Sequence, residues 1–313
     1  VQDTAHLGTD SVQAQPQTAV LGLLAQAHQR AQAGGVDERH SAEVQHQRRG
    51  GGLERRAGSR AELVHGRDVE LTKQLGFNMI RKHVKVEPAR WYYYCDQMGI
   101  LVWQDMPSGD KNPPWSPLGI HNGKQIERSK ESADNFRHEW KNIMDSLMHF
   151  PSIVCWVPFN EAWGQFDTVG VTEWTKRHDP SRLVYCARGG NDFPTGDISD
   201  LHRYPGPTIP ALEEKRASVL GEFGGLGLPL AGHTWQSEKN WGYRSFTSKE
   251  DLNDAYAVLI KRLHPLIGKG LCAAVYTQTT DVEVEVNGFM TYDRSVIKFD
   301  VPKTAALSKL LFT

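Results

Sequence analysis

Two glutamates, Glu161 and Glu222, stand where apolar segments end, and their positions suggest acid–base or nucleophilic chemistry. Glu161 follows the apolar run 152–159 directly after Asn160, and Glu222 lies inside "VLGEFGG". Because a buried strand avoids unpaired charges, a carboxylate at its tip is a candidate functional group. Two carboxylates that face each other across a sugar can hydrolyse a glycosidic bond. They are roughly 5–5.5 Å apart in retaining enzymes and roughly 6.5–9.5 Å apart in inverting ones.

The elements that would position these groups alternate along the chain from residue 67 onward. Helical patterns alternate with seven apolar, strand-like runs at 77–84, 100–107, 152–159, 182–187, 197–205, 217–224 and 272–279. Near-continuous apolar strands are typical of parallel sheets that are buried on both faces. Such a pattern fits either a doubly wound sheet or a (β/α)8 barrel.

Polar residues at the ends of these runs favour the barrel. Strand ends converge on one mouth in a barrel, whereas a doubly wound sheet gathers only those near its switch point. We therefore predict an α/β fold, a (β/α)8 TIM barrel whose first strand is missing or irregular. The polar residues that end the runs are Arg81, His83, Gln104, Asp105, Asn160, Glu161, His202, Tyr204, Glu222, Thr277 and Gln278.

The segment 1–66 differs from the rest of the chain. It has no aromatic residue and no Ile, Met, Lys, Asn or Cys, and is rich in Ala, Gln, Gly, Arg and His. Such a composition cannot bury much core. We expect 1–66 to be an unassigned segment, either disordered or translated out of frame, and 67–313 to form the catalytic barrel.

Composition and charge indicate which classes of binding partner to expect. The formal net charge is −1, with 39% hydrophobic and 23% charged residues, which fits a globular protein without a nucleic-acid or membrane partner. The four cysteines are scattered, and we interpret them as small buried hydrophobes. His and carboxylate residues lack metal-ligand spacing, and no glycine-rich phosphate loop is present, so no metal or cofactor is predicted.

Five ordered blocks carry a family resemblance from about Asp68 to the C-terminus. The sequence resembles the catalytic barrel of glycoside hydrolase family 2, which contains β-galactosidases, β-glucuronidases and β-mannosidases. The resemblance implies a carbohydrate substrate. The blocks are "GFNMIRKH…EPARWYYYCDQMGILVWQDMPS", "HFPSIVCWVPFNEAWG", "LHRYPG", "VLGEFGG" and "VYTQTTDVEVEVNGFMTYDR".

The resemblance implies a role for each matching residue around Glu161. Glu161 matches the general acid/base, which protonates the departing oxygen and then deprotonates water. Asn160 matches the amide that grips the sugar 2-hydroxyl. Trp156 and Trp163 are expected to shield Glu161 from water and so to favour its protonated form.

Glu222 matches the nucleophile that forms a covalent glycosyl-enzyme intermediate. Tyr204 is expected to hold Glu222 as a carboxylate through its phenol, and Arg81 matches a basic residue that supports the nucleophile. Four further residues are candidates with two interpretations each. His202 either touches the sugar or makes a local hydrogen bond, Gln104 and Asp105 either touch the sugar or brace the structure, and Trp235 either stacks on the sugar or packs within its loop.

The sequence therefore predicts a retaining exo-β-glycosidase, similar to β-galactosidases, that releases a terminal β-linked sugar by double displacement with two glutamates. Two alternatives remain open. One is a non-catalytic, truncated fragment of such an enzyme, because no β-sandwich domain and no first barrel strand are recognisable upstream of Asp68. The other is a retaining endo-glycanase of a related barrel family, which the "LHRYPG" and "TQTTDVEVEVNG" blocks disfavour.

Overall fold

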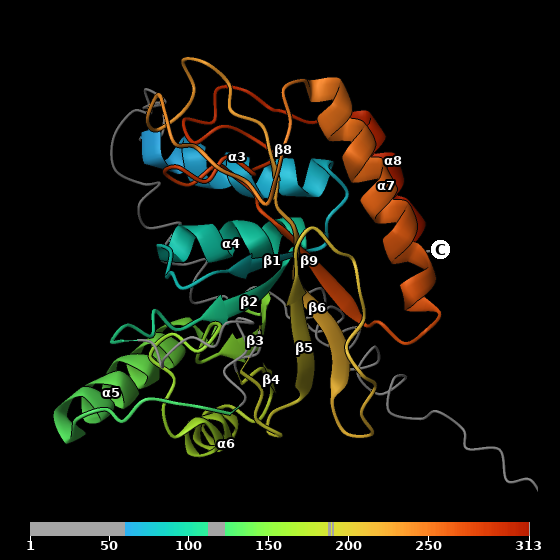
Figure 1. The fold of residues 1–313 in the computed structure, drawn as a ribbon. Helices are drawn as coiled ribbons and strands as arrows, with labels where there is room; N and C mark the ends of the chain where they lie inside the picture. The colour runs from blue at the N-terminus through green and yellow to red at the C-terminus, as the bar shows by residue number, and fades with distance from the viewer. Residues whose placement is uncertain (1–59, 112–122, 187–188, 190, 313) are drawn as a thin grey trace, which may run out of the picture.

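In a computed structural model, the chain forms parallel strands at the centre with helices packed around them (Figure 1). The structure describes residues 60–111, 123–186, 189 and 191–312. Within these ranges, no helix has both the length and the apolar character needed to cross a membrane. The helices are α3 (Arg60–Gln74), α4 (Ala89–Met98), α5 (Lys130–Leu147), α6 (Thr168–His178), α7 (Lys249–Ile267), α8 (Val301–Lys309) and the 3-10 turn η1 (Leu310–Phe312).

All seven predicted strands are present, in the predicted order. They form two parallel sheets, β1-β2-β3-β4 and β5-β6-β9, and a short pair β7-β8 lies in the loop that follows β6. The strands are β1 (Met79–Lys82), β2 (Leu101–Asp105), β3 (Ile153–Val157), β4 (Leu183–Val184), β5 (Ile198–Arg203), β6 (Ala217–Gly224), β7 (Leu226–Gly227), β8 (Arg244–Ser245) and β9 (Ala273–Thr277).

The two sheets continue one curved wall. Asp197, just before β5, donates its backbone N–H to the Val184 carbonyl at 2.8 Å and accepts from the Val184 N–H through its carboxylate at 2.7 Å. Among the described residues, no strand pairs with the free edges of β1 and β9. Within the described residues the fold is thus a TIM barrel without a strand between β9 and β1, in line with a first strand that is missing or irregular.

Local signals in the sequence set the helix boundaries. Ser129 caps α5 by accepting the Ser132 N–H at 3.1 Å, so this helix starts at Lys130. Ser248 caps α7 in the same way. The predicted domain boundary at residues 66 and 67 stays a prediction, because residues 1–59 lie outside the described part of the chain.

Three apolar clusters explain why the strands read as continuous apolar runs. One fills the inside of the wall and includes Trp103, Cys155 and Val219. A second packs α4, α5 and α6 against the outside of β1–β3, and a third packs α7 and α8 against β6 and β9. Strands with apolar side chains on both faces are therefore buried from both sides. All four cysteines are free thiols, and three are buried.

Candidate active site

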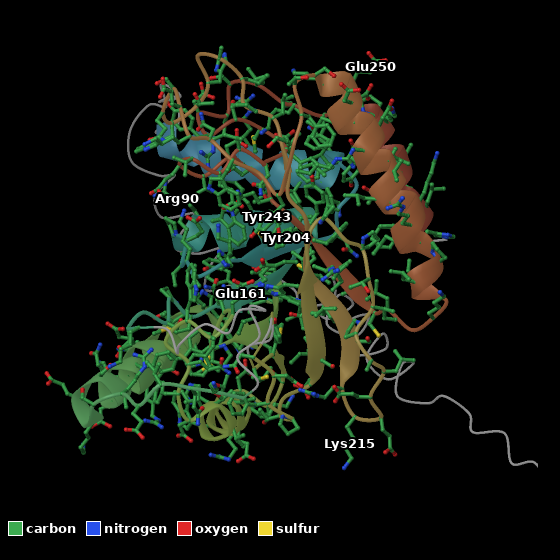
Figure 2. All side chains as sticks on the ribbon, viewed as in Figure 1. Arg90, Glu161, Tyr204, Lys215, Tyr243 and Glu250 are labelled. Atoms are coloured by element: carbon green, nitrogen blue, oxygen red, sulfur yellow. The ribbon has the colours of Figure 1, made fainter. Side chains whose placement is uncertain are left out.

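The carboxyl ends of the strands bring most of the predicted residues together. Arg81 is near the end of β1, His202 near the end of β5 and Glu222 near the end of β6, while Glu161 follows β3. Figure 2 shows Glu161 and Tyr204 in the middle of the view, with Lys215 and Glu250 at its far ends. The predicted convergence of strand ends on one mouth gives this arrangement.

His202 lies between the two glutamates. Its Nδ1 atom is 2.7 Å from Glu161 Oε1 and 3.3 Å from Glu222 Oε2. One oxygen of each glutamate and a ring nitrogen of His202 all lie within 4.8 Å of one another. The imidazole, only 3% exposed, therefore bridges the two carboxylates.

Asp200 contacts His202 at Nε2, the ring nitrogen that does not face the glutamates. Its Oδ2 atom is 3.1 Å from His202 Nε2, and its fully buried carboxylate also accepts from the Tyr185 phenol and the Gly221 N–H. A Cβ at position 221 would lie 2.4 Å from Asp200 Oδ1, so glycine is required there. Burial alone would lower the pKa of His202, but the charges of Glu222 and Asp200 outweigh it and raise that pKa to about 10. His202 is therefore an imidazolium.

Arg81 connects three other residues of the site. Asp105 accepts from Arg81 Nε at 3.1 Å and from Nη2 at 2.8 Å. The same guanidinium donates to Glu222 Oε1 at 3.0 Å and to Asn160 Oδ1 at 2.7 Å. Asp105 thus orients Arg81, and Arg81 orients both the nucleophile candidate and the amide beside Glu161.

Glu222 is held in its ionised form. Burial alone would raise the pKa of Glu222, but the neighbouring positive groups outweigh burial. The charges of His202, Arg81 and His83, together with the Tyr204 hydrogen bond, lower that pKa to about 2. Glu222 is a carboxylate throughout the physiological pH range, as a nucleophile requires.

Tyr204 contacts Glu222 and forms an aromatic wall of the site together with Tyr243. Its phenol donates to Glu222 Oε2 at 2.5 Å and is 2.8 Å from Thr277 Oγ1. Its ring stacks on Tyr243 with 3.6 Å between centroids. A Cβ at Gly225 would lie 2.4 Å from the Tyr243 ring, so the glycine pair after Glu222 makes room for this aromatic wall.

A tight turn presents Glu161. Glu161 and Ala162 have φ values of 47° and 83°, in the left-handed region where non-glycine residues are uncommon. A Cβ at Gly189 would lie 2.7 Å from both Glu161 Cγ and His202 Nδ1. The chain therefore packs directly against the Glu161–His202 pair, and such conformations concentrate at functional sites.

Two predicted residues contact other parts of the fold. Gln104 is fully buried, accepts from the Tyr92 phenol at 2.5 Å and donates to the Lys85 carbonyl at 2.8 Å. These contacts favour the bracing interpretation of Gln104. Trp235 is 61% exposed and meets Tyr292 edge-on with 5.7 Å between ring centroids, a contact that favours the loop-packing interpretation.

The two tryptophans expected to shield Glu161 are placed differently. Trp156 points into the core outside the sheet, where its indole N–H donates to Asp179 at 2.8 Å. The expectation for Trp156 was wrong, because alternate residues of β3 face opposite sides. Trp163 is 40% exposed, and its ring centroid is 6.3 Å from that of His83. His83 Nε2 is in turn 3.8 Å from Glu222 Oε1.

Sequence reasoning missed Asp200, the role of Thr277, and Tyr243. Asp200 carried a usable signal, since it precedes His202 by two residues and therefore lies on the same face of β5. Thr277 stood at a predicted strand end without an assigned role. Tyr243 lies in a loop without periodicity, and only the glycine pair at 224–225 hinted that a bulky group approaches there.

Comparison with known proteins relates this chain to glycosyl hydrolases. The family described as "Glycosyl hydrolases family 2, TIM barrel domain" matches residues 39–213. A β-mannosidase B from Aspergillus clavatus is 33% identical over 132 residues, which cover 39% of this chain and 13% of that protein. A β-galactosidase from Vibrio cholerae is 28% identical over 181 residues, which cover 50% of this chain and 16% of that protein.

Solved structures share the fold. A β-D-glucuronidase from Dictyoglomus thermophilum has a TM-score of 0.57 at 16% identity, covering 85% of this chain and 48% of that chain. A β-glucuronidase from Bacteroides uniformis has a TM-score of 0.54 at 16% identity, covering 74% of this chain and 31% of that chain. The chain spans 13–16% of the length of these curated relatives. Because the family match covers more than half of the sequence, the chain belongs to glycosyl hydrolase family 2 and carries its TIM barrel domain.

Proposed function

We propose that this protein is a retaining exo-β-glycosidase that removes a terminal β-linked sugar by double displacement, as a β-galactosidase does. The spacing of the two glutamates is the observation that carries the proposal. Oxygen atoms of Glu161 and Glu222 lie within 4.8 Å of each other. This spacing is closer to the roughly 5–5.5 Å of retaining enzymes than to the roughly 6.5–9.5 Å of inverting ones, and so supports a retaining mechanism.

In the first step, Glu222 attacks the anomeric carbon and forms a glycosyl ester, while the bond to the glycosidic oxygen breaks. Because its pKa is low, Glu222 is ionised near neutral pH and has an electron pair free for this attack. Glu161 gives a proton to the departing oxygen. In its protonated form Glu161 supplies this proton, and His202 Nδ1, 2.7 Å from Glu161 Oε1, orients the group.

In the second step, Glu161 takes a proton from water, and the resulting hydroxyl oxygen attacks the anomeric carbon. The ester bond breaks and Glu222 leaves as a carboxylate, so the sugar keeps its β-configuration. Arg81 and Tyr204 hold the two Glu222 oxygens at 3.0 and 2.5 Å, and thereby stabilise the charge that returns to this group.

Asn160 is positioned to recognise the sugar. Its Oδ1 accepts from Arg81 at 2.7 Å, which directs the amide so that Nδ2 carries two donors. No described residue accepts from Nδ2. An amide donor beside the acid/base suits the 2-hydroxyl of the sugar, where hydrogen bonds strengthen in the transition state.

In the described part of the chain no strand lies between β9 and β1, which favours a second candidate, a barrel that keeps the catalytic residues but does not turn over substrate. Hydrolysis of nitrophenyl β-galactoside, β-mannoside, β-glucoside and β-glucuronide decides between the two. We expect turnover of at least one glycoside and its loss in Glu222→Gln, with Glu214→Gln as the matched control because Glu214 is exposed. A folded protein that is silent on the whole panel would contradict the proposal.

A further inference from the structure

A third carboxylate, Glu285, lies in the segment that follows β9. Asn287 Nδ2 donates to Glu285 Oε1 at 2.7 Å, and Gln278 Nε2 donates to Asn287 Oδ1 at 2.6 Å. Gln278 directly follows Thr277, whose hydroxyl is 2.8 Å from the Tyr204 phenol. Side-chain hydrogen bonds and the peptide bond between Thr277 and Gln278 therefore connect the nucleophile candidate to Glu285.

The backbone ties Glu285 to the aromatic wall from the other side. Trp241 donates its N–H to the Val284 carbonyl at 2.9 Å and accepts from the Val286 N–H at 2.9 Å. The Trp241 ring meets Tyr243 edge-on at 5.3 Å, and Tyr243 stacks on Tyr204. Glu285 thus lies beside the wall that faces the two catalytic glutamates.

Electrostatics supports this placement. Burial and the charges of Glu222, Asp281 and Glu161 raise the pKa of Glu285 against the opposing effect of the Asn287 hydrogen bond. Burial, followed by the charge of Glu285, raises the pKa of Tyr243. Asn287 occupies Glu285 Oε1, whereas no described residue donates to Oε2.

We propose that Glu285 determines which sugar the site accepts: its Oε2 receives hydrogen bonds from hydroxyl groups of a neutral hexose, and its charge excludes a hexuronic acid. This inference rests on the proposed function and adds the substrate class to it. Ionised carboxylates are strong acceptors for sugar hydroxyls. A sugar carboxylate at the same place would meet a like charge, which disfavours binding.

The positive groups around the glutamates are already engaged and do not offset this repulsion. Arg81 is bonded to Asp105, Glu222 and Asn160, and His202 lies between the two glutamates. His83 is 3.8 Å from Glu222. We therefore expect the site to bind neutral glycosides such as β-galactosides and β-mannosides, after which the curated relatives are named. We do not expect it to bind β-glucuronides, after which the structural neighbours are named.

Binding to an inactive protein tests the inference separately from turnover. Calorimetry with Glu222→Gln should show binding of nitrophenyl β-galactoside or β-mannoside and much weaker binding of nitrophenyl β-glucuronide. Adding Glu285→Gln should lower the affinity for the neutral ligand about 10- to 100-fold, the loss expected for a hydrogen bond to a charged group. It should also reduce the difference in affinity between the neutral ligand and the glucuronide. Adding Glu283→Gln instead should change neither, because Glu283 is exposed in the same segment.

Each outcome of these binding measurements either supports or overturns the inference. Preference for the glucuronide in the Glu222→Gln protein, or equal neutral-sugar affinity with and without Glu285→Gln, overturns the inference. If the Glu285→Gln protein does not fold, as judged by its melting curve, the ligand preference of the Glu222→Gln protein alone decides. Selective binding of neutral sugars by a wild-type protein that hydrolyses none of the glycosides would support the inference and overturn the proposed function.

Discussion

Asp105 holds Arg81 through two hydrogen bonds, at 3.1 and 2.8 Å, and the side chains of both residues are at most 2% exposed. The arrangement leaves the remaining N–H groups of Arg81 directed at Glu222 and Asn160. A buried ion pair of this kind is costly to break, because removing one charge leaves the other without compensation. The pair therefore connects the stability of the barrel to the orientation of Glu222.

Asp105→Asn tests this connection. We expect a loss of about 3–5 kcal/mol in the free energy of unfolding, measured by urea denaturation, together with a fall in kcat. Asp134→Asn removes a surface partner of Lys130 and is the matched control, since exposed pairs contribute little. Equal, small effects of the two substitutions would show that Arg81 does not depend on Asp105.

We expect His202 to set the acidic limb of the pH–rate profile. Its charge opposes the effect of burial on Glu222 and helps to lower the pKa of Glu222 to about 2. Because the nucleophile acts when ionised, a raised pKa removes activity at low pH. We expect His202→Asn to move the acidic limb of kcat/KM to higher pH, whereas His233→Asn, in a pair with Asp293, leaves it in place. Superimposable profiles for His202→Asn and wild type would refute this assignment.

Glu161→Gln tests the acid/base role. We expect kcat to fall about 10²- to 10⁴-fold with a poor leaving group, and much less with dinitrophenolate, which departs without protonation. Added azide should restore turnover of the dinitrophenyl glycoside and yield the β-glycosyl azide, because a small anion then replaces the water that Glu161 activates. A loss that is independent of the leaving group, without azide rescue, would rule the role out.

Tyr204→Phe removes one hydrogen bond and keeps the stack on Tyr243. The bond to Glu222 is 2.5 Å long and goes to an ionised group, so we expect kcat/KM to fall about 10- to 100-fold. Tyr93→Phe, which changes a phenol that is 52% exposed, serves as the control and should retain full activity. Unchanged kcat/KM in Tyr204→Phe would mean that this hydrogen bond does not help the reaction.

Strand order and strand ends could be predicted because apolar runs and polar tips are local features of the sequence. The face toward which a side chain points could not be predicted in the same way. Gln104 and Asp105 are neighbours at one strand end, yet Asp105 reaches Arg81 and Gln104 reaches Tyr92 of α4. Successive residues of a strand point to opposite sides, so only one of the pair can face the mouth.

Residues from long loops were the hardest to predict. Tyr243 and Glu285 approach the site through ring stacking and backbone pairing between segments that lie far from the glutamates in sequence. No periodicity marks such segments, and their packing depends on the complete barrel. Trp235, an aromatic residue in the same region, contacts Tyr292 and is 61% exposed, which the sequence did not distinguish from a sugar-stacking position.

Trapping of the covalent intermediate tests the central claim most directly. A 2-deoxy-2-fluoro aryl glycoside of the sugar that the protein hydrolyses slows both steps, and a good leaving group lets the ester accumulate. We expect mass spectrometry of peptides to place one fluorosugar on Glu222, and turnover of the parent glycoside to release the β-sugar first. A label on another residue, or initial release of the α-sugar, would contradict a double displacement at Glu222.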